Sequence, residues 1–423
     1  MSIKRLSQVF LALGITSMIF TAGLVMGYRY PGALGLDSTT RTTSPSTSSR
    51  SLGLDALLPK DTVNEQDFDL FWRVWNLAKE KHVDRPGDDD QLIYGAINGM
   101  LQLGYDDQFS AFLEPEINTM ASEDLSGSFG GVGVELEIKN GYLTIVAPIP
   151  DTPGDKAGLL AGDMITAIDG EDNSTWTIIE SVSKMRGQIN TTVRLSILRI
   201  LDDGEIKEFD VDIKRALIDV ESVKWELLEG DIAYMKIRNF AADTNAEWDR
   251  VVTEIVAAQP KALILDLRNN AGGYITAAVH MVSEFVSGGK VITQDFGQGD
   301  KRIMRVTGEG RLFDIPMVIL INRGTASSSE MVTGALQDYE RATVIGVNSY
   351  GKGVIQEIFS IDLGDKGEAS VRIVTARWYT PNDRWVQDDG LEPDIEVKTT
   401  MEQYEQGIDP VMERAIEELQ GIL

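Results

Sequence analysis

The fold is organised around residues 317–330, which read Met317-Val-Ile-Leu-Ile321 and then Asn322-Arg-Gly-Thr-Ala-Ser327-Ser-Ser-Glu330. The apolar run is too short for a helix and rich in β-branched residues, so it predicts a buried strand. The serines that follow are typical of a helix start. Backbone N–H groups at a helix start are unpaired and point outward, which makes such turns suitable for reactive groups. Ser327 lies at this turn.

Two structural interpretations compete with a catalytic one. The run from Ser327 to Glu330 matches a capping box, in which the serine accepts from a helical N–H and the glutamate reaches back. Residues 346–352, Gly-Val-Asn-Ser-Tyr-Gly-Lys, have the spacing of a phosphate-binding P-loop. However, Gly353 stands where that loop needs a hydroxyl for magnesium. A P-loop nucleotide enzyme is therefore the weakest alternative.

The serine run is followed by Gly351-Lys-Gly-Val-Ile-Gln356. Together, the two stretches resemble the carboxyl-terminal processing peptidases, which are serine proteases whose nucleophile is activated by a lysine. The resemblance implies that Ser327, Lys352 and Gln356 carry out the chemistry. Two positions differ from many members of that family, since Ser328 replaces an alanine and Tyr350 a phenylalanine. Neither change removes a reacting atom.

The chemistry of a lysine base sets requirements on the site. A serine hydroxyl attacks an amide only if a base takes its proton as the bond forms. Lys352 can be that base only when neutral, so the pKa of about 10.4 of a free lysine must fall by several units, which burial in an apolar pocket achieves. We therefore expect a dry pocket with no carboxylate beside Lys352. Gln356 would orient the amine without adding a charge.

A second turn carries paired glycines. It reads Asp266-Leu-Arg-Asn-Asn-Ala-Gly272-Gly273 and follows a predicted strand. Paired glycines let a backbone approach a substrate closely. The family resemblance implies that this turn supplies one oxyanion-hole donor, which we assign to the Gly273 N–H with Gly272 as the alternative; the Ser328 N–H would be the other. A strand-ending turn in which Arg268 pairs with Asp266 is compatible with this role.

Composition limits the remaining possibilities. The chain has 423 residues, 43% of them hydrophobic, which is enough for two or three domains. Its 39 basic and 66 acidic residues give a net charge of −27, which argues against nucleic-acid binding. The absence of cysteine excludes disulfides and thiol catalysis. A Ser-His-Asp triad would have to use His82 or His280, and two histidines are too few for a multi-histidine metal site. We expect no cofactor.

The N-terminal segment predicts a membrane attachment. Lys4 and Arg5 precede an uncharged apolar run over 9–26, whose length is near that of a membrane span. We interpret residues 1–28 as an uncleaved signal anchor that places the rest outside the cytoplasm. Cleavage, giving a periplasmic or secreted protein, is the alternative. Residues 29–61 are rich in serine and threonine and form the expected linker.

The next segment, 62–118, predicts two helices. Apolar residues recur in it at helical spacing: Phe68, Phe71, Trp75 and Ala78, then Leu92, Ala96 and Met100. Residues so spaced are typical of a helical core, and we expect two packed helices. The segment also resembles the N-terminal helical region of the same peptidases.

Residues 119–214 contain short alternating runs broken by glycine turns, which favours a small β-rich module. The order of these runs resembles a PDZ domain. In such domains a glycine-rich loop offers backbone N–H groups to the terminal carboxylate of a peptide. The corresponding residues are Gly130, Gly131, Val132, Gly133 and Val134. The alternative is that these glycines only permit tight turns.

Strands and helices alternate in residues 215–400. The predicted strands are 232–237, 262–267, 317–321 and 343–345, and the predicted helices are 246–258, 274–286 and one after Ser327. This alternation favours an α/β core with parallel strands. Its order resembles the crotonase-like core of the same family. Within residues 401–423 we expect a closing helix over 409–419.

These observations predict an α/β multidomain serine endopeptidase with a crotonase-like core, an inserted PDZ domain and an N-terminal helical region. It would recognise proteins or peptides with a free C-terminus and cleave them by a Ser-Lys mechanism in the processing or degradation of envelope proteins. A membrane anchor and a possible homo-oligomer complete the prediction. The alternative is a peptide-binding scaffold without catalysis. The joint presence of the serine, lysine, glutamine and paired glycines argues against it.

Overall fold

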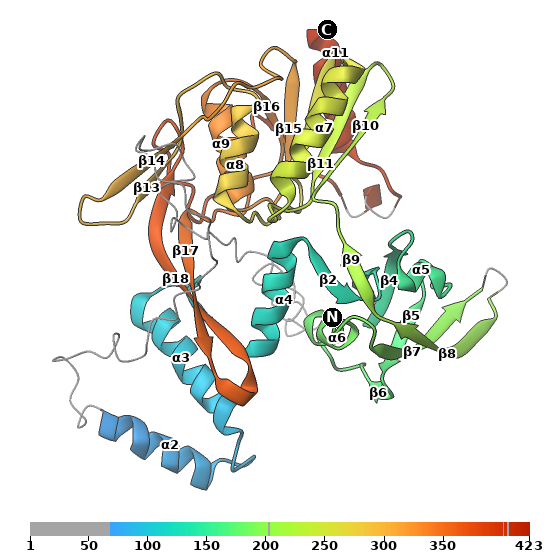
Figure 1. The fold of residues 1–423 in the computed structure, drawn as a ribbon, viewed down its shortest axis with the longest axis vertical. Helices are drawn as coiled ribbons and strands as arrows, with labels where there is room; N and C mark the ends of the chain where they lie inside the picture. The colour runs from blue at the N-terminus through green and yellow to red at the C-terminus, as the bar shows by residue number, and fades with distance from the viewer. Residues whose placement is uncertain (1–67, 140, 202–203, 401, 404–405) are drawn as a thin grey trace, which may run out of the picture. The chain divides into compact units, whose positions relative to one another are not determined.

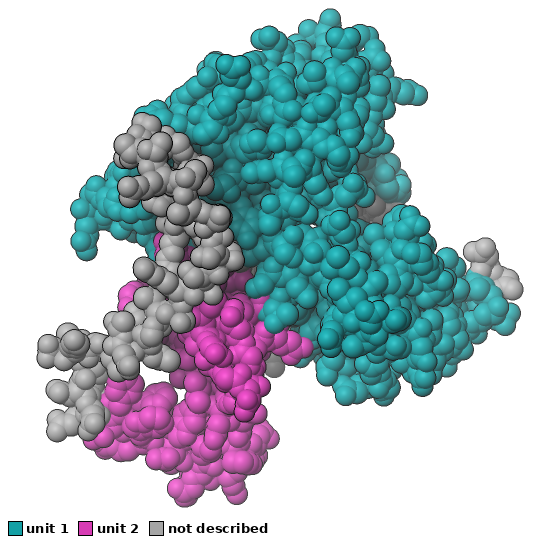
Figure 2. Space-filling view, in the orientation of Figure 1, with its two compact units in different colours: residues 1–25, 119–356, 375–423 teal, residues 26–118, 357–374 magenta. Residues whose placement is uncertain are grey.

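The computed structural model describes residues 68–139, 141–201, 204–400, 402–403 and 406–423 (Figure 1). The predicted signal anchor and linker lie outside these residues. No helix among the described residues has the length and apolar character that a membrane crossing needs. The chain divides into two compact units, and their described parts are residues 119–356 with 375–423, and residues 68–118 with 357–374 (Figure 2).

The larger unit is built on a six-stranded sheet. In order across the sheet, its strands are β10 (Val223–Leu228), β11 (Ile232–Ile237), β12 (Ala262–Asp266), β15 (Met317–Ile321), β16 (Thr343–Gly346) and β19 (Ile395–Glu396). The β10–β11 pair is antiparallel, and the other pairs are parallel. The predicted parallel α/β core is therefore observed, with strands β12 and β15 adjacent.

Helices enclose this sheet. They are α7 (Thr244–Ala258), α8 (Ile275–Ser283), α9 (Ser328–Asp338) and α11 (Pro410–Ile422). All five residues of β15 are buried, and Val318 and Leu320 share a core with Val411 and Leu419 of α11. Because side chains alternate along a strand, Ile319 faces the opposite layer. Burial on both faces explains the uninterrupted apolar run of this strand.

The predicted helices are present with shifted ends. The prediction of 246–258 begins two residues late, that of 274–286 is too long at both ends, and that of 409–419 stops three residues early. Helix α8 ends early because the chain turns at Glu284. The N–H of this residue donates to the carbonyls of Met281 and Val282. Apolar periodicity continues past this turn, so it does not reveal the end of the helix.

The β-rich module within the larger unit has its own sheet and core. Its strands are β3 (Val134–Lys139), β4 (Tyr142–Pro148), β5 (Met164–Ile168), β6 (Glu171–Asp172), β7 (Thr192–Ile200) and β8 (Ile206–Lys214), with helices α5 (Pro153–Lys156) and α6 (Ile178–Met185). Ile145, Ile165 and Leu195 are among the residues that fill its core. Strands β2 (Ser128–Gly131) and β9 (Ala216–Asp219) pair where the chain enters and leaves the module.

Further elements complete the two units. The larger unit contains the hairpin of β13 (Lys290–Asp295) and β14 (Lys301–Arg305), and helix α4 (Pro115–Ser126) has residues in both units. The smaller unit contains α2 (Asp69–Lys81), α3 (Asp89–Tyr105) and β1 (Ala111–Leu113). The strands β17 (Val354–Asp362) and β18 (Glu368–Tyr379) have residues in both units.

The prediction that two packed helices bury their aromatic stripe is wrong for α2. None of its residues is buried, and its rings contact each other: Phe71 lies against Trp72 and Trp75. In α3 the buried face is shifted, since Met100 is 59% exposed whereas Leu101 is buried against Phe112. The apolar spacing of the sequence predicts a helix but does not specify what covers it, because several apolar stripes fit one helix.

Candidate active site

Ser327 lies at the turn between β15 and α9, as predicted. It is 1% exposed, and its backbone has φ 54° and ψ −118°. A non-glycine residue at such angles is strained by about 1–3 kcal/mol, so the surrounding structure must hold it there. One such contact is the Ser327 N–H, which donates to Glu330 Oε2 at 2.8 Å. The glutamate half of the predicted capping box is thus present.

Lys352 lies in the loop before β17 and is fully buried. Its Nζ donates to Oε1 of the buried Gln356 at 2.5 Å, so the predicted pair is brought together. A strand follows this glycine-rich loop, whereas a P-loop leads into a helix whose N-terminus binds phosphate. The nucleotide-binding alternative is therefore wrong.

Two indole groups hold the lysine loop in place. Trp378 Nε1 donates to the Lys352 carbonyl at 2.8 Å, and Trp385 Nε1 donates to the Gly353 carbonyl at 2.9 Å. Trp378 is fully buried. Sequence reasoning missed both contacts, because a tryptophan distant in sequence carries no signal of the carbonyl that it will meet.

The paired glycines contact the serine turn directly. A Cβ on Gly272, where φ is +100°, would lie 2.8 Å from Ser327 Cβ and 2.9 Å from the Ser328 nitrogen. The Gly272 N–H donates to Asn270 Oδ1 at 2.9 Å. The Gly273 carbonyl accepts from Ser328 Oγ, also at 2.9 Å. Only glycine at position 272 allows the two turns to pack this closely.

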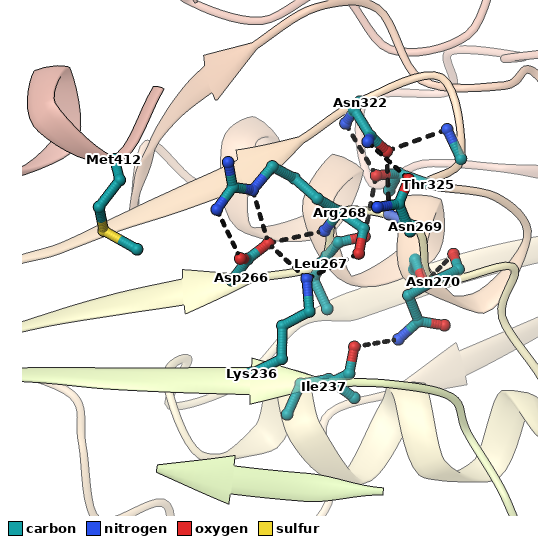
Figure 3. Close-up of polar contacts among 12 residues, drawn as sticks. Lys236, Ile237, Asp266, Leu267, Arg268, Asn269, Asn270, Asn322, Thr325 and Met412 are labelled. Carbon is teal, nitrogen blue, oxygen red and sulfur yellow. Dashed lines mark hydrogen bonds and ion pairs between the residues drawn. The ribbon is translucent and has the colours of Figure 1, made fainter. Parts of the chain in front are cut away.

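Asn270 is a further link between the turns that the sequence did not reveal. This buried side chain donates from Nδ2 to the Ile237 carbonyl at 3.0 Å (Figure 3). The backbone carbonyl of Asn270 accepts from the Ala326 N–H at 3.0 Å and from Ser329 Oγ at 2.9 Å. The glycine turn and the serine turn are therefore fixed to each other and to β11.

A second set of contacts reinforces this arrangement. Thr325 Oγ1 donates to the Leu267 carbonyl at 2.9 Å, and the Asn269 N–H donates to Asn322 Oδ1 at 2.9 Å (Figure 3). Asn322 Nδ2 returns a bond to Asn269 Oδ1 at 2.7 Å. Because parallel strands end at one edge of a sheet, residues 53–58 positions apart in sequence meet here.

A buried carboxylate anchors the glycine turn. Arg268 NH2 lies 2.8 Å from Asp266 Oδ2, as predicted, and Lys236 Nζ lies 3.1 Å from Oδ1 (Figure 3). Arg268 also pairs with Asp409 at the start of α11, at 2.8 Å. Burial pushes the pKa of Asp266 upward, but the bonds and charges of Arg268 and Lys236 outweigh burial and hold the pKa below its usual value.

Replacing Asp266 by asparagine should destabilise the fold by about 1–3 kcal/mol near neutral pH, because Lys236 and Arg268 lose a buried charged acceptor while Arg268 keeps Asp409. A carboxylate with a lowered pKa stabilises the fold above the ordinary carboxyl pKa of about 3.9 and ceases to do so as pH falls through its folded value. Urea unfolding of both proteins at several pH values measures this. A difference that grew on acidification would contradict the interpretation.

A buried carboxylate that the sequence did not reveal contacts the backbone of Lys352, whereas the Lys352 amine donates to Gln356. Glu330 is fully buried, and its Oε2 accepts from the Lys352 N–H at 3.0 Å. Burial raises the pKa of Glu330, and this effect outweighs the hydrogen bonds that lower it. Sequence reasoning considered Glu330 only as a helix cap, and a local capping pattern gives no sign of a contact 22 residues away.

The predicted carboxylate-binding loop is closely packed. The Gly130 carbonyl accepts from the Gly187 N–H at 3.0 Å, and the Gly133 carbonyl accepts from the Ile149 N–H at 3.0 Å. Gly133 has φ +77°, and a Cβ there would lie 2.4 Å from Thr152 Cβ. Gly133 therefore occupies a tight turn, an observation that fits both the tight-turn and the carboxylate-binding interpretations.

The two histidines are engaged elsewhere. His280 lies on α8, and its Nε2 is 3.0 Å from Asp249 Oδ1 of α7. His82 follows α2, and its Nδ1 accepts from the Asp84 N–H at 3.1 Å. Ser327 instead lies against Gly272 of the glycine turn, and Glu330 links its N–H to that of Lys352. This geometry disfavours a histidine triad.

Comparison with known proteins identifies the family. Residues 231–397 match the profile of Peptidase family S41, and residues 144–199 match that of a PDZ domain. The Carboxy-terminal-processing protease of Bartonella bacilliformis is 39% identical over 347 residues, which are 81% of this chain and 76% of that protein. The chain belongs to peptidase family S41. It is a serine peptidase with a PDZ domain.

Two other similar proteins agree with the assignment of this chain to family S41. The Carboxy-terminal processing protease CtpA of Bacillus subtilis is 31% identical over 338 residues, covering 80% of this chain and 70% of that protein. A candidate S41 protease from Bacteroides fragilis NCTC 9343 has the same mixed α/β fold, with a TM-score of 0.52 and 16% identity over 76% of this chain and 88% of that one.

Proposed function

We propose that this peptidase recognises the free C-terminus of a protein or peptide and cleaves the polypeptide with Ser327 as nucleophile and Lys352 as general base. The observation that carries the proposal is the buried bond of 2.5 Å between Lys352 Nζ and Gln356 Oε1. This hydrogen bond places the lysine amine beside a neutral amide in a buried, water-poor site. The names of the two relatives support the processing of C-termini.

The proposed proton path starts from a neutral Lys352. A neutral amine has two N–H groups and one lone pair; Gln356 accepts from one N–H and thereby orients the lone pair. As Ser327 Oγ attacks the carbonyl carbon, Lys352 Nζ takes the hydroxyl proton. The resulting ammonium protonates the leaving amine, which gives an acyl-enzyme. Water then attacks the ester, Lys352 accepts a proton from it, and Ser327 leaves with its proton restored.

The oxyanion of each tetrahedral intermediate needs backbone donors. We assign the N–H groups of Gly273 and Ser328 to this task, each contributing about 3 kcal/mol to transition-state stabilisation. The Gly272 N–H is already bonded to Asn270, which favours Gly273 over Gly272 as the donor. The Ser328 N–H belongs to the first residue of α9, where helix N–H groups lack an intrahelical acceptor.

The architecture supports two finer assignments. The parallel strands β11, β12, β15 and β16 with their flanking helices support a crotonase-like core, and α2 and α3 support an N-terminal helical region.

We further propose that residues 1–28 anchor the protein with its catalytic part outside the cytoplasm. Accessibility of residues 68–423 to protease in intact cells tests the location. Sedimentation velocity tests the predicted homo-oligomer.

The full-length protein incubated with an unfolded protein tests the proposed activity. We expect fragments whose new ends, mapped by mass spectrometry, include sites near the original C-terminus. An intact substrate, bound through its C-terminus but never cut, would instead favour the peptide-binding scaffold.

The proposed carboxylate recognition by residues 130–134 predicts a preference for free C-termini. A peptide ending in a free acid should be cleaved at least about tenfold faster at limiting concentration than its amide, because the charge-assisted bonds to backbone N–H groups are lost. Gly133→Ala should weaken this preference, since its Cβ would displace the loop from Thr152.

Gly141→Ala is the matched control, because Gly141 has φ +87° in the same module and open space around it. Each variant is measured with both peptides. Equal rates for the free acid and the amide with the unmodified enzyme would show that the carboxylate is not read.

A further inference from the structure

A single buried carboxyl group joins the two segments that carry the proposed nucleophile and base. Glu330 Oε2 accepts from the Ser327 N–H at 2.8 Å and from the Lys352 N–H at 3.0 Å. Its Oε1 accepts from the Gly351 N–H at 2.7 Å and from Ser349 Oγ at 2.6 Å. Glu330 is fully buried on the first turn of α9.

These four bonds match the capacity of a carboxylate. Two oxygens offer about four lone pairs, and each is directed at a donor. A helix cap requires only the bond to Ser327. The other three bonds reach a loop that lies 19 to 22 residues further along the chain, so they do not serve the helix.

Both bonded segments need an external support. Ser327 has a strained backbone, with φ 54°, and Lys352 lies in a loop outside regular secondary structure. One carboxylate oxygen contacts both backbones, so a shift of either segment disturbs the other. Catalytic groups misplaced by about 1 Å lose roughly a hundredfold in rate.

We infer that Glu330 is a positioning residue that sets the geometry between Ser327 and Lys352, with Ser349 as the residue that fixes Glu330. The inference rests on the proposed function, because it assigns Glu330 a role only if Ser327 and Lys352 act together. Glu330 makes no contact with substrate in this mechanism. It acts through the two backbones that it joins.

Glu330→Gln tests the inference. The amide keeps the size of the side chain but replaces one acceptor oxygen with an NH₂ group, which faces N–H donors in either orientation of the amide. We expect kcat for a peptide substrate to fall by about a hundredfold while KM changes less than about threefold. Labelling of Ser327 by a fluorophosphonate should slow in parallel, which reports the geometry of the nucleophile without peptide binding.

Glu284→Gln is the matched control. Glu284 is also a buried glutamate of the same unit, but its partner is Arg311, whose Nε donates to Oε1 at 3.1 Å. We expect this variant to lose thermal stability and to retain kcat. The inference is overturned if the Glu330 variant keeps the kcat of the unmodified enzyme, or if it loses no more than the Glu284 variant does.

Ser349→Ala covers the case in which the Glu330 variant does not fold. The serine hydroxyl donates to Glu330 and accepts from the Leu391 N–H at 2.6 Å. Its loss should lower kcat by roughly tenfold, and in a double-mutant cycle the two effects should combine to less than their product. A folded Ser349 variant with unchanged kcat overturns the inference.

The experiment separates this inference from the proposed function. An unmodified enzyme that neither cleaves peptide nor reacts with the fluorophosphonate would show that the proposed function itself is wrong. An active enzyme whose Glu330→Gln and Ser349→Ala variants cleave normally would contradict only the positioning role.

Discussion

Replacing Ser327 by alanine is expected to abolish peptide cleavage, with a loss in kcat of roughly 10⁴- to 10⁶-fold, because the attacking oxygen is removed. Lys352→Ala should lose activity to a similar extent, since the proposed acceptor of the serine proton is removed. The double variant should be hardly worse than either single one, because the two groups form one proton-transfer unit. Steady-state kinetics with a peptide substrate measure all three proteins.

Thermal unfolding provides the control for this comparison. Ser327→Ala removes one hydroxyl and should leave the unfolding temperature nearly unchanged, so its inactivity cannot be ascribed to misfolding. Residual cleavage above a few per cent in a folded Ser327→Ala protein would show that another nucleophile acts. Losses of the two single variants that simply multiplied in the double variant would show that they act independently.

Gly272→Ala is expected to reduce kcat by at least about a hundredfold, because the turn that carries the proposed oxyanion donor would be pushed away. A Cβ at this position would lie 2.8 Å from Ser327 Cβ and 2.9 Å from the Ala326 carbonyl oxygen. Both contacts are too short to persist, so one of the two turns must move. Kinetics with the same peptide measure the effect.

Gly299→Ala is the control for backbone strain. Gly299 has φ +88°, close to the +100° of Gly272, but a Cβ there meets no atom within 4 Å. Alanine at either position carries the strain of a left-handed backbone, roughly 1 kcal/mol. We expect full activity from Gly299→Ala. Equal loss of activity in the two variants would show that strain alone, and not the contact with Ser327, causes the effect.

The pair of strand-ending turns could be predicted from the sequence because local patterns specify it. A buried apolar run followed by a serine-rich helix start places Ser327, and the family pattern supplies Lys352, Gln356 and the paired glycines. The alternation of strands and helices then places both turns at the same edge of a parallel sheet. The predicted contacts of Arg268 with Asp266 follow from their spacing of two residues.

Other parts of the site depend on contacts that sequence spacing does not encode. Glu330 looks like a helix cap, yet it bonds to Lys352 across 22 residues. Asn270 and Trp378 fix backbone carbonyls of distant segments, and side-chain chemistry alone does not identify those carbonyls. The stripe of α2 shows the same limit, because hydrophobic periodicity indicates a face without naming its cover.

Lys352→Arg tests the Ser-Lys mechanism most directly. Arginine keeps hydrogen-bond donors at this position, but its guanidinium stays protonated and cannot accept the serine proton. The measurement is kcat/KM of the full-length variant over the pH range in which it stays folded, beside the unmodified enzyme. The Ser-Lys mechanism predicts no cleavage at any of these pH values. Cleavage by the folded arginine variant at a rate near that of the unmodified enzyme would contradict it.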